Sequence, residues 1–510
     1  MSRVVVVGAG MAGLAAAARL ATLGHQVTVC EQGDRVGGKV QTVHQDGFAF
    51  DAGPSLLTLP AVYRDLFVKT GRPLEDALDL VEVDPAFRYR FAADQAAGHP
   101  VTWLDLPNAA RARTAAALES ALGSGAGSDW DGLLERAHAI WQVTRGPFLE
   151  SALGGVRDLA RLARRTRDVA TVAPWRSLRA LGRQQLRDPR LRLMLDRYAT
   201  YTGSDPRRAP AARAVVPYVE ATFGVWHVRG GLGGLAAAVH ERAVERGARV
   251  RLGADVARVV VEGGRTSAVV LSSGERLDAD VVVSDADAGH LYRDLVPSST
   301  ARSARRGVTR TTPSLSAFVL LLALRRPTPD VGHHTVLFPG PYPRAYDAEL
   351  DAVFGAGRAG ARPVEDPTVY LCAPADPTMR PDGHEAWSVL VNAPRHGDPR
   401  RGLVDWDAPG LAEAYADRVL QVMAERGVEV RDRVLWRQVR TPADLARETR
   451  APGGSIYGSS SNGARAAFLR PANRSPVRGL YLVGGSAHPG GGLPLVGLSA
   501  AIVAELIGPA

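Results

Sequence analysis

Cysteine and lysine are both scarce in this chain of 510 residues. Only Cys30 and Cys372 occur, which excludes a disulfide framework and a cysteine-rich metal site. Of the 62 basic residues, only Lys39 and Lys69 are lysine, a bias more typical of a GC-rich genome than of a chemical need. The net charge of +9 favours acidic surfaces, either nucleic acid or an anionic membrane. Zinc-finger spacings and aromatic RNA-binding motifs are missing, so we expect no nucleic-acid partner.

Long apolar runs are missing as well. Ala317–Leu324 is one of the longest and is far shorter than the roughly 20 residues that cross a bilayer. The first residues already form a strand, with no basic head before an apolar stretch, so we expect no secretory signal. Apolar residues make up 45% of the chain and charged residues 23%, which is ordinary globular composition. We therefore expect a cytoplasmic protein with more than one domain.

Three separated stretches alternate between strand and helix patterns. The first opens with the valine run Arg3–Val7, followed by a glycine turn, an alanine-rich helix and a second strand. Two other stretches separate them. Residues 71–227 have a helix-like pattern, and residues 291–475 have a mixed pattern with a strand expected at Leu315–Leu324. The pattern predicts an α/β fold in which a discontinuous Rossmann-type domain holds an inserted mixed α+β substrate domain. The predicted boundaries are 1–70, 228–290 and 476–510 for the first domain, and 71–227 and 291–475 for the second.

The glycine turn after the first strand has the spacing of a dinucleotide site. Gly8 allows the tight turn, Gly10 lets the backbone approach a pyrophosphate, and Gly13 lets the helix pack closely on the sheet. The helix N-terminus, starting at Met11-Ala12, offers free N–H groups to phosphate. Glu31 ends the next strand, where a carboxylate can accept hydrogen bonds from ribose hydroxyls.

The next residues favour FAD over NAD. Glu31 is followed by Arg35, the pair Gly37-Gly38 and Lys39, a run that resembles the FAD-binding extension of the amine-oxidase-like flavoprotein superfamily. Adjacent glycines let the chain pass under a flavin, and a basic side chain can meet a phosphate. In the same superfamily a residue at the position of Val256 holds the adenine through its backbone, although a plain core valine is the alternative.

The C-terminal run from Tyr481 to Pro494 predicts the other end of the flavin site. A strand delivers Gly484 and Gly485 to the ribityl chain, and the helix after Pro494 points its N-terminus at the flavin pyrimidine. Many flavoproteins have Gly-Asp where this chain has Gly484-Gly485. A carboxylate contact to the ribityl chain is therefore absent or comes from elsewhere in the chain.

Blocks along nearly the whole chain resemble the bacterial carotenoid desaturases of the phytoene-desaturase type. The matching blocks are Gly47–Thr58, Val228–Gly234, Ala279–Asp287, Asp366–Tyr370 and His488–Pro494. The resemblance implies a fold like glutathione reductase and the amine oxidases, with FAD as cofactor. It adds these residues to the expected flavin site: Gly53, Pro54, Ser55, Asp285, Gly492 and Leu493.

Three further blocks lean toward the branch that desaturates the 3,4 bond of 1-hydroxylated acyclic carotenoids. They are Glu385–Pro394, Gly458–Asn462 with Ala467–Arg470, and Gly484–Pro489. Phytoene or neurosporene desaturation and oxidation of a terminal methyl group remain alternatives. So do amine oxidation on the same fold and a non-catalytic carotenoid-binding flavoprotein. The resemblance implies that one substrate hydrogen leaves as hydride to flavin N5 and the other as a proton, with dioxygen or a quinone as final acceptor.

Three residues are candidates for the catalytic chemistry. His488 lies in the expected flavin-proximal loop and could assist proton removal, or could be a loop histidine bonded to backbone. His227 and Glu220 precede the second glycine turn and could line the substrate tunnel or sit in a domain interface. The pair His333-His334 resembles metal ligands, but no second ligand cluster is spaced to complete a site, so no metal is expected.

Residues 151–173 have the pattern of a membrane-surface helix. Apolar residues recur at helical spacing from Val156 to Ala163, arginines surround them, and Trp175 follows. Because carotenoids partition into bilayers, we expect peripheral association with the inner face of the cell membrane. An arginine-rich solvated face on an ordinary helix is the alternative.

Overall fold

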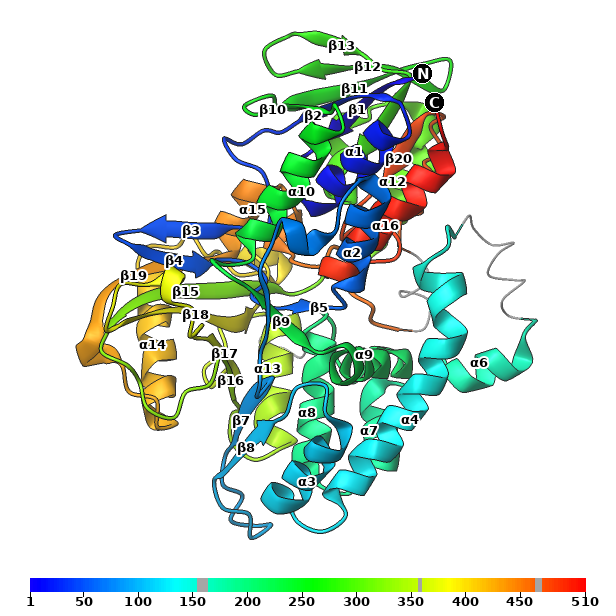
Figure 1. Cartoon of the computed structure of the whole chain (residues 1–510). Coiled ribbons are helices and arrows are strands. Elements are labelled where there is room, and N and C mark those ends of the chain that lie inside the picture. The colour runs from blue at the N-terminus through cyan, green and yellow to red at the C-terminus, as the bar shows by residue number, and fades with distance from the viewer. Residues whose placement is uncertain (154–163, 356–359, 464–469) are drawn as a thin grey trace.

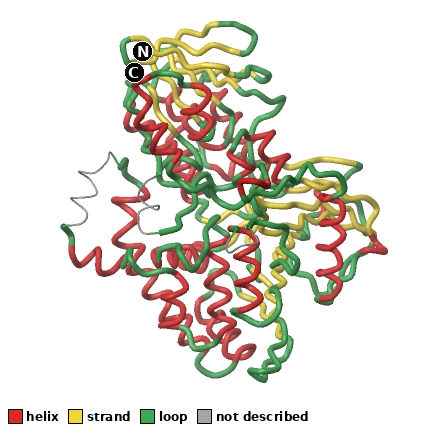
Figure 2. The backbone as a smooth tube through the Cα atoms, turned by 180° about the vertical axis from the view of Figure 1, so that it is seen from behind, coloured by secondary structure: helices red, strands yellow, loops and turns green. Residues whose placement is uncertain are grey.

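A computed structural model describes residues 1–153, 164–355, 360–463 and 470–510. The sheet-and-helix lobe that carries both chain termini lies at the top of Figure 1, above a second large sheet and a helical lobe. Figure 2 shows the same three parts from behind. As the chain passes from an α/β stretch to an inserted stretch, it therefore passes from one lobe to another.

A five-stranded parallel sheet forms the centre of the top lobe. Its order is β10 (Arg249–Arg251), β2 (Gln26–Cys30), β1 (Arg3–Val7), β14 (Val281–Ser284) and β20 (Leu480–Leu482). These strands come from three separated stretches of sequence, as in the predicted Rossmann-type fold, which is confirmed.

Both faces of this sheet are buried because the valines of β1 alternate between two cores. Val4 and Val6 pack with the helices α1 (Met11–Thr22), α10 (Gly233–Glu245), α16 (Leu493–Ile507) and α2 (Ala61–Thr70). Val5 and Val7 pack toward the antiparallel sheet of β11 (Val256–Glu262), β12 (Arg265–Leu271) and β13 (Arg276–Asp278). A strand covered on both sides needs the continuous apolar sequence seen here.

The second large sheet has seven strands. Their order is β19 (Val434–Arg440), β15 (Ser316–Arg325), β18 (His384–Ala393), β17 (Val369–Cys372), β16 (His334–Leu337), β7 (Phe87–Phe91) and β8 (Thr102–Leu106). On one face, Phe318, Leu320 and Leu322 pack with α14 (Leu411–Glu425). On the other, Ala317, Val319 and Leu321 meet the hairpin of β3 (Thr42–Gln45) and β4 (Phe48–Asp51). The strand expected at Leu315–Leu324 is therefore present as β15, an interior strand covered on both faces.

The stretch 71–227 is less helical than its composition predicts. It contains α3 (Arg111–Leu122), α4 (Ala126–Thr144), α6 (Thr166–Val172), α7 (Leu178–Gln185), α8 (Pro189–Thr200) and α9 (Val215–Phe223), but also β6 (Leu80–Glu82), β7, β8 and β9 (Val225–Val228). In β7 the buried positions are Phe87, Tyr89 and Phe91, a period of two that marks a strand inside a helix-rich segment. β9 pairs with β6 and with β5 (Leu57–Thr58).

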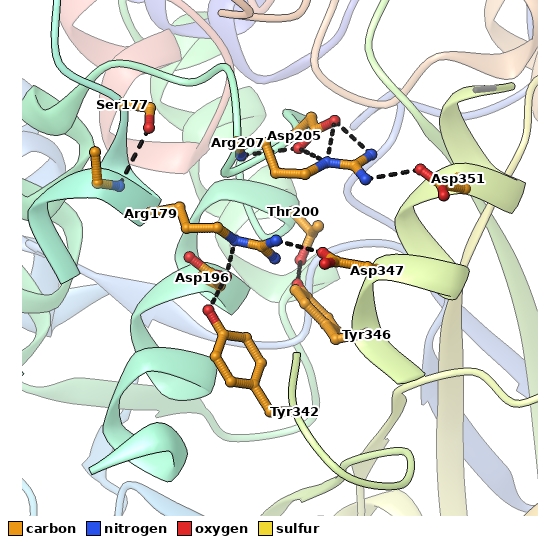
Figure 3. A network of polar contacts seen from close by, with 11 residues as sticks. Ser177, Arg179, Asp196, Thr200, Asp205, Arg207, Tyr342, Tyr346, Asp347 and Asp351 are labelled. Atoms are coloured by element: carbon orange, nitrogen blue, oxygen red, sulfur yellow. Dashed lines mark hydrogen bonds and ion pairs between the residues drawn. The ribbon is translucent and has the colours of Figure 1, made fainter. Parts of the chain in front are cut away.

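A buried polar network fastens the helical lobe to the second sheet lobe (Figure 3). The Arg179 guanidinium of α7 donates to Asp196 of α8 at 2.7 Å and also bonds Asp347 of α13 (Arg344–Phe354). Tyr342 donates to the same Asp196 at 2.9 Å. Because the Asp196 carboxylate is satisfied by two donors, it can lie in the interior and fix the approach of α13 to α8. The remaining helices are α11 (Ala288–His290), α12 (Arg302–Thr309) and α15 (Pro442–Thr449).

Candidate active site

A cavity of about 520 Å³ lies between the top lobe and the two inserted parts. One end is formed by the glycine turn after β1, the end of β2 and the loop before α16. The other end is formed by side chains of α4, α8, α9, β15 and β18. One continuous space therefore joins the predicted cofactor residues to an apolar region built from the inserts.

The turn from β1 into α1 has the shape that a bound phosphate requires. A Cβ on Gly10 would lie 2.5 Å from Asp285 Oδ2, and one on Gly13 would lie 2.2 Å from the Gly8 carbonyl oxygen. Gly10 has no side chain to cap α1, and Asp285 accepts the Gly13 N–H, which leaves the N–H groups of Met11 and Ala12 for an anion. Glu31 accepts the Ala9 N–H at 2.7 Å and lines the cavity, where its carboxylate can meet ribose hydroxyls.

The Gly37-Gly38 pair packs directly on this turn. The Gly37 N–H donates to the Ala9 carbonyl at 2.8 Å, and a Cβ on Gly38 would lie 3.2 Å from Gly10 Cα. Lys39 also lines the cavity, where it donates to the Ser455 carbonyl at 2.9 Å and burial lowers its pKa. The Arg35 side chain differs, because it is 60% exposed and is not part of the cavity wall. Its Nε lies 3.5 Å from Asp34 Oδ1.

Asp285, at the end of β14, supplies a carboxylate beside the last glycine loop. It accepts the Gly13 N–H at 2.9 Å, and a Cβ on Gly484 would lie 2.3 Å from its Oδ1. Burial raises the Asp285 pKa to about 7, with the Gly13 hydrogen bond opposing the shift. Many flavoproteins carry a carboxylate at the position of Gly485. In this chain Asp285, at the end of a different strand, places a carboxylate at the same loop. Gly485 lines the cavity, whereas Gly484 and Gly13 lie behind its wall.

The N-terminus of α16 closes the same end of the cavity. Gly492 precedes the helix with φ 117°, a left-handed value that favours glycine. Tyr63 of α2 donates to the Leu493 carbonyl at 2.8 Å, which fixes this turn against the helix layer. The remaining predicted cofactor residues also line the cavity: Gly8, Met11, Ala12, Gly53, Pro54, Ser55, Val256, Leu493 and Pro494. The glycine cradle, the uncapped helix and the carboxylates fit FAD.

The opposite end of the cavity is mainly apolar. Trp141 and Leu149 come from α4 and the turn after it, Val216 and Val219 from α9, and Leu390 from β18. The apolar part of this wall excludes water and accommodates a long hydrocarbon.

Glu220 is the one predicted catalytic residue that lines the cavity. It is 4% exposed, and Tyr198 donates to its Oε1 at 2.5 Å while Oε2 has no partner among the described residues. Burial raises the Glu220 pKa to about 7, and the Tyr198 hydrogen bond and the nearby Arg197 charge oppose the shift. This carboxyl can therefore gain or lose a proton near neutral pH.

His488 and His227 lie outside the cavity wall. The His488 ring is buried, and its Nε2–H donates to the Ser151 carbonyl at 3.1 Å. Burial lowers the His488 pKa to about 4, so the ring is neutral at neutral pH. His227 lies 3.0 Å from Asp376 through Nε2, away from the described lining. A direct role of either histidine stays a prediction.

Two arginines in the wall, the buried Arg197 and the half-buried Arg213, were not found from the sequence. The Arg213 guanidinium bonds the Ser461 hydroxyl, and no carboxylate of the described residues pairs with it. Burial lowers its pKa to about 10. Arg197 lies over the rings of Tyr201 and Tyr370, which also line the cavity. Because the chain has 60 arginines, nothing in the sequence distinguishes these two from the others, and only the fold brings them to the cavity.

The segment predicted to contact a membrane is only partly described. Residues 154–163, which hold its whole apolar stripe, and residues 464–469, which hold most of the block Ala467–Arg470, lie outside the described residues. Arg167 lies in α6, and the Trp175 side chain is 68% exposed. Among the helices described, none is both long and apolar enough to span a bilayer.

Comparison with known proteins places this geometry in a family. The family described as flavin containing amine oxidoreductase matches residues 11–507. A 4,4'-diapolycopene oxygenase from Methylomonas sp is 34% identical over 99% of this chain and 98% of its own length. A hydroxyneurosporene desaturase from Rubrivivax gelatinosus is 34% identical over 99% of this chain and 93% of its own length. A solved oxidoreductase structure from Methanosarcina mazei, 18% identical, matches with a TM-score of 0.63 over 99% of this chain and 100% of its own.

Proposed function

Because the chain belongs to the flavin-containing amine oxidoreductase family and uses FAD, we propose that it is a desaturase of acyclic carotenoids. The observation that carries the proposal is the cavity, which joins a flavin cradle at one end to an apolar wall at the other. A polyene that enters along this wall brings its carbon chain to the cofactor end. The relatives named as desaturases, at full-length similarity, support the same chemistry for this chain.

Desaturation removes two hydrogens from adjacent carbons and leaves a new double bond between them. Bound FAD supplies the two-electron acceptor that takes one of these hydrogens as hydride. Gly10, Gly38 and Asp285 would hold the cofactor, and the uncapped start of α1 would bind its phosphates. Val219 and Leu390 keep water from the reacting carbons. Glu220 faces the same space and can take up a proton near neutral pH.

The finer proposal is that the substrate is a 1-hydroxylated carotenoid, desaturated at the 3,4 bond. Arg213 supports it, because its half-buried guanidinium, which pairs with no carboxylate among the described residues, offers hydrogen-bond donors to an oxygen atom of the substrate. A purely hydrocarbon end group would leave those donors unsatisfied. The similarity to a hydroxyneurosporene desaturase points to the same substrate class.

A second candidate is oxidation of the carotenoid end group. It is favoured by the similarity to a 4,4'-diapolycopene oxygenase over nearly the full length of both chains. An oxidised end group would also place oxygen near Arg213. The two candidates differ in product, because desaturation adds no oxygen to the substrate whereas oxygenation does.

Expression in cells that accumulate either phytoene, a 1-hydroxylated acyclic carotenoid or an acyclic C30 polyene separates these candidates. We expect the 1-hydroxylated pigment to lose two hydrogens by mass spectrometry and to shift its absorption to the red. Gain of oxygen by the C30 polyene would instead support end-group oxidation. If no pigment changes mass while the purified protein contains FAD, the carotenoid proposal is wrong. Anaerobic bleaching of the bound flavin by the pigment distinguishes turnover from mere binding.

We also propose that the protein docks on the inner face of the cell membrane and passes its electrons to a quinone or to dioxygen. Leu149 lines the cavity only a few residues before the basic segment 151–173, so a lipid substrate entering there has a short path inward. Co-sedimentation with anionic liposomes should be strong at low salt and reduced by Trp175→Ala. Trp103→Ala, on a different lobe, is the matched control. Absence of binding at low and at high salt would contradict docking.

A further inference from the structure

The adjacent histidines His333 and His334 acquire a third partner when the second sheet forms. β16 and β17 pair in antiparallel register with His334 opposite Cys372, so their side chains meet on one face. One ligating atom from each of His333, His334 and Cys372 lies within 4.8 Å of the other two. The sequence places Cys372 38 positions after His334, which is why no ligand spacing is visible there.

One nitrogen of each histidine in this cluster is buried without a hydrogen-bond partner among the described residues. Nε2 of His333 and Nε2 of His334 bond no group among the described residues. His334 is 1% exposed, and its Nδ1 lies 2.8 Å from the Tyr370 hydroxyl, which lies 2.7 Å from Ser55 Oγ. If Nδ1–H donates to Tyr370, the lone pair of Nε2 is free to bind a metal, the arrangement usual for metal-bound histidine. An unsatisfied buried nitrogen is otherwise costly.

His227, on β9, lies beside this cluster. Its ring lies edge-on to His333 with centroids 4.9 Å apart, and its Nδ1 is buried without a partner. Its Nε2 donates to Asp376 at 3.0 Å, the carboxylate–histidine pair that orients a metal ligand. Asp376 is itself fixed by the Gly230 N–H at 2.7 Å. Burial opposes ionisation of this carboxyl, but its hydrogen bonds outweigh burial and hold the Asp376 pKa below its ordinary value.

We propose that His333, His334 and Cys372, with His227 as fourth ligand, bind a divalent transition metal of the zinc class. Thiolate and imidazole are the ligands that such ions prefer, in four-coordinate geometry. Tetrahedral bonds of about 2.0–2.3 Å require the ligating atoms of His333, His334 and Cys372, now within 4.8 Å of one another, to move closer together, and they require His227, which lies outside that group, to turn toward them. The Cys372 thiolate and the Asp376 carboxylate balance the two positive charges of the ion.

The protonation states of the proposed ligands are compatible with metal binding. Burial lowers the pKa of His333 to about 3 and holds that of His334 well below its ordinary value, so both rings are neutral and able to bind metal at neutral pH. Burial raises the pKa of the Cys372 thiol, so binding must release its proton. The Arg197 guanidinium, 5.7 Å from the centroid of the Tyr370 ring, places a positive charge near His334 and opposes a cation there.

The ion would join three strands behind the wall of the active-site cavity. It would connect β9, β16 and β17, and through His334 it would fix Tyr370 and Ser55, which both line the cavity. Its role would be to hold that wall, because the ligands themselves lie away from the described lining.

The full chain, produced without a histidine tag in zinc-supplemented cells, should hold one zinc ion per FAD by elemental analysis. After chelation, added Co²⁺ should give thiolate-to-cobalt absorption, read against the metal-free protein because flavin absorbs nearby. Cys372→Ser should remove this band and lower the zinc content at least fivefold. Cys30→Ser, which changes the other buried cysteine in the top lobe, should leave both unchanged.

Flavin content reports folding in every variant. If Cys372→Ser loses flavin, His333→Ala serves instead, since His333 is less buried than His334 and Cys372. Substoichiometric zinc in the parent chain together with no cobalt band would overturn the proposal. So would a folded variant at either position that binds metal as the parent does. Since each readout is metal content or a metal spectrum, the result is independent of whether the chain desaturates carotenoids.

Discussion

Replacing Gly13 by alanine should give a folded chain with little bound FAD. The added Cβ would lie 2.2 Å from the Gly8 carbonyl oxygen and 3.2 Å from Asp285 Oδ2. The carbonyl belongs to the turn itself, so α1 must move away from β1 to relieve the contact. Overpacking of this kind costs about 1–3 kcal/mol. The same movement displaces the helix N-terminus from the phosphates, and we expect at least a tenfold loss of affinity, equivalent to about 1.4 kcal/mol.

Gly132→Ala is the matched control, because Gly132 also lies in a helix and a Cβ there meets nothing within 4 Å. It should leave flavin content unchanged or raise stability slightly, as alanine favours helix over glycine. The measurement is the ratio of flavin to protein after purification, followed by titration of the flavin-free chain with FAD. Equal FAD affinity in Gly13→Ala and the parent would mean that the glycine turn does not hold the phosphates.

The cofactor half of the site was predictable because its signals are local in sequence. Gly8, Gly10 and Gly13 lie within six residues, and each constraint, a turn or a close approach, can be satisfied only by glycine. Asp285 could be placed only through the resemblance, because its contact with Gly484 joins strands far apart in the chain. The Arg35 side chain, in the same local run, lies in solvent. The motif therefore predicted the path of the backbone better than the position of this side chain.

The substrate half was predicted less well because nothing local marks it. Glu220 was one of three catalytic candidates, yet only its place on α9 brings it to the cavity. Arg213 reaches the same wall from the turn before α9. The strands β7 and β8 were missed because short period-two patterns were outweighed by the alanine-rich and arginine-rich helices around them. Whether such segments become strands depends on pairing with strands hundreds of residues away in the sequence. Local periodicity in the sequence does not reveal this pairing.

Glu220→Gln should remove a pH-dependent loss of stability. The Glu220 pKa rises from its ordinary value of 4.5 to about 7 in the folded chain. Between these values the folded state holds the proton and the unfolded state does not, so wild-type stability falls as pH rises from 4.5 to 7. The full loss is up to about 3 kcal/mol, since one pKa unit is worth about 1.4 kcal/mol. Glutamine keeps the Tyr198 hydrogen bond and has no such loss.

Unfolding midpoints at pH 5, 7 and 9 measure this effect, with the exposed Glu241→Gln on α10 as the control. The two Gln variants should differ little from wild type at pH 5, and only Glu220→Gln should be the more stable at pH 9.

Turnover supplies the second readout. If Glu220 accepts the substrate proton, kcat rises through about pH 7 in the wild type and falls strongly in Glu220→Gln at every pH. If the carboxyl only lines the cavity, the stability difference appears while the pH dependence of kcat is the same in both proteins. A wild type whose stability is flat from pH 5 to 9 would contradict the buried, protonated carboxyl on which both expectations rest.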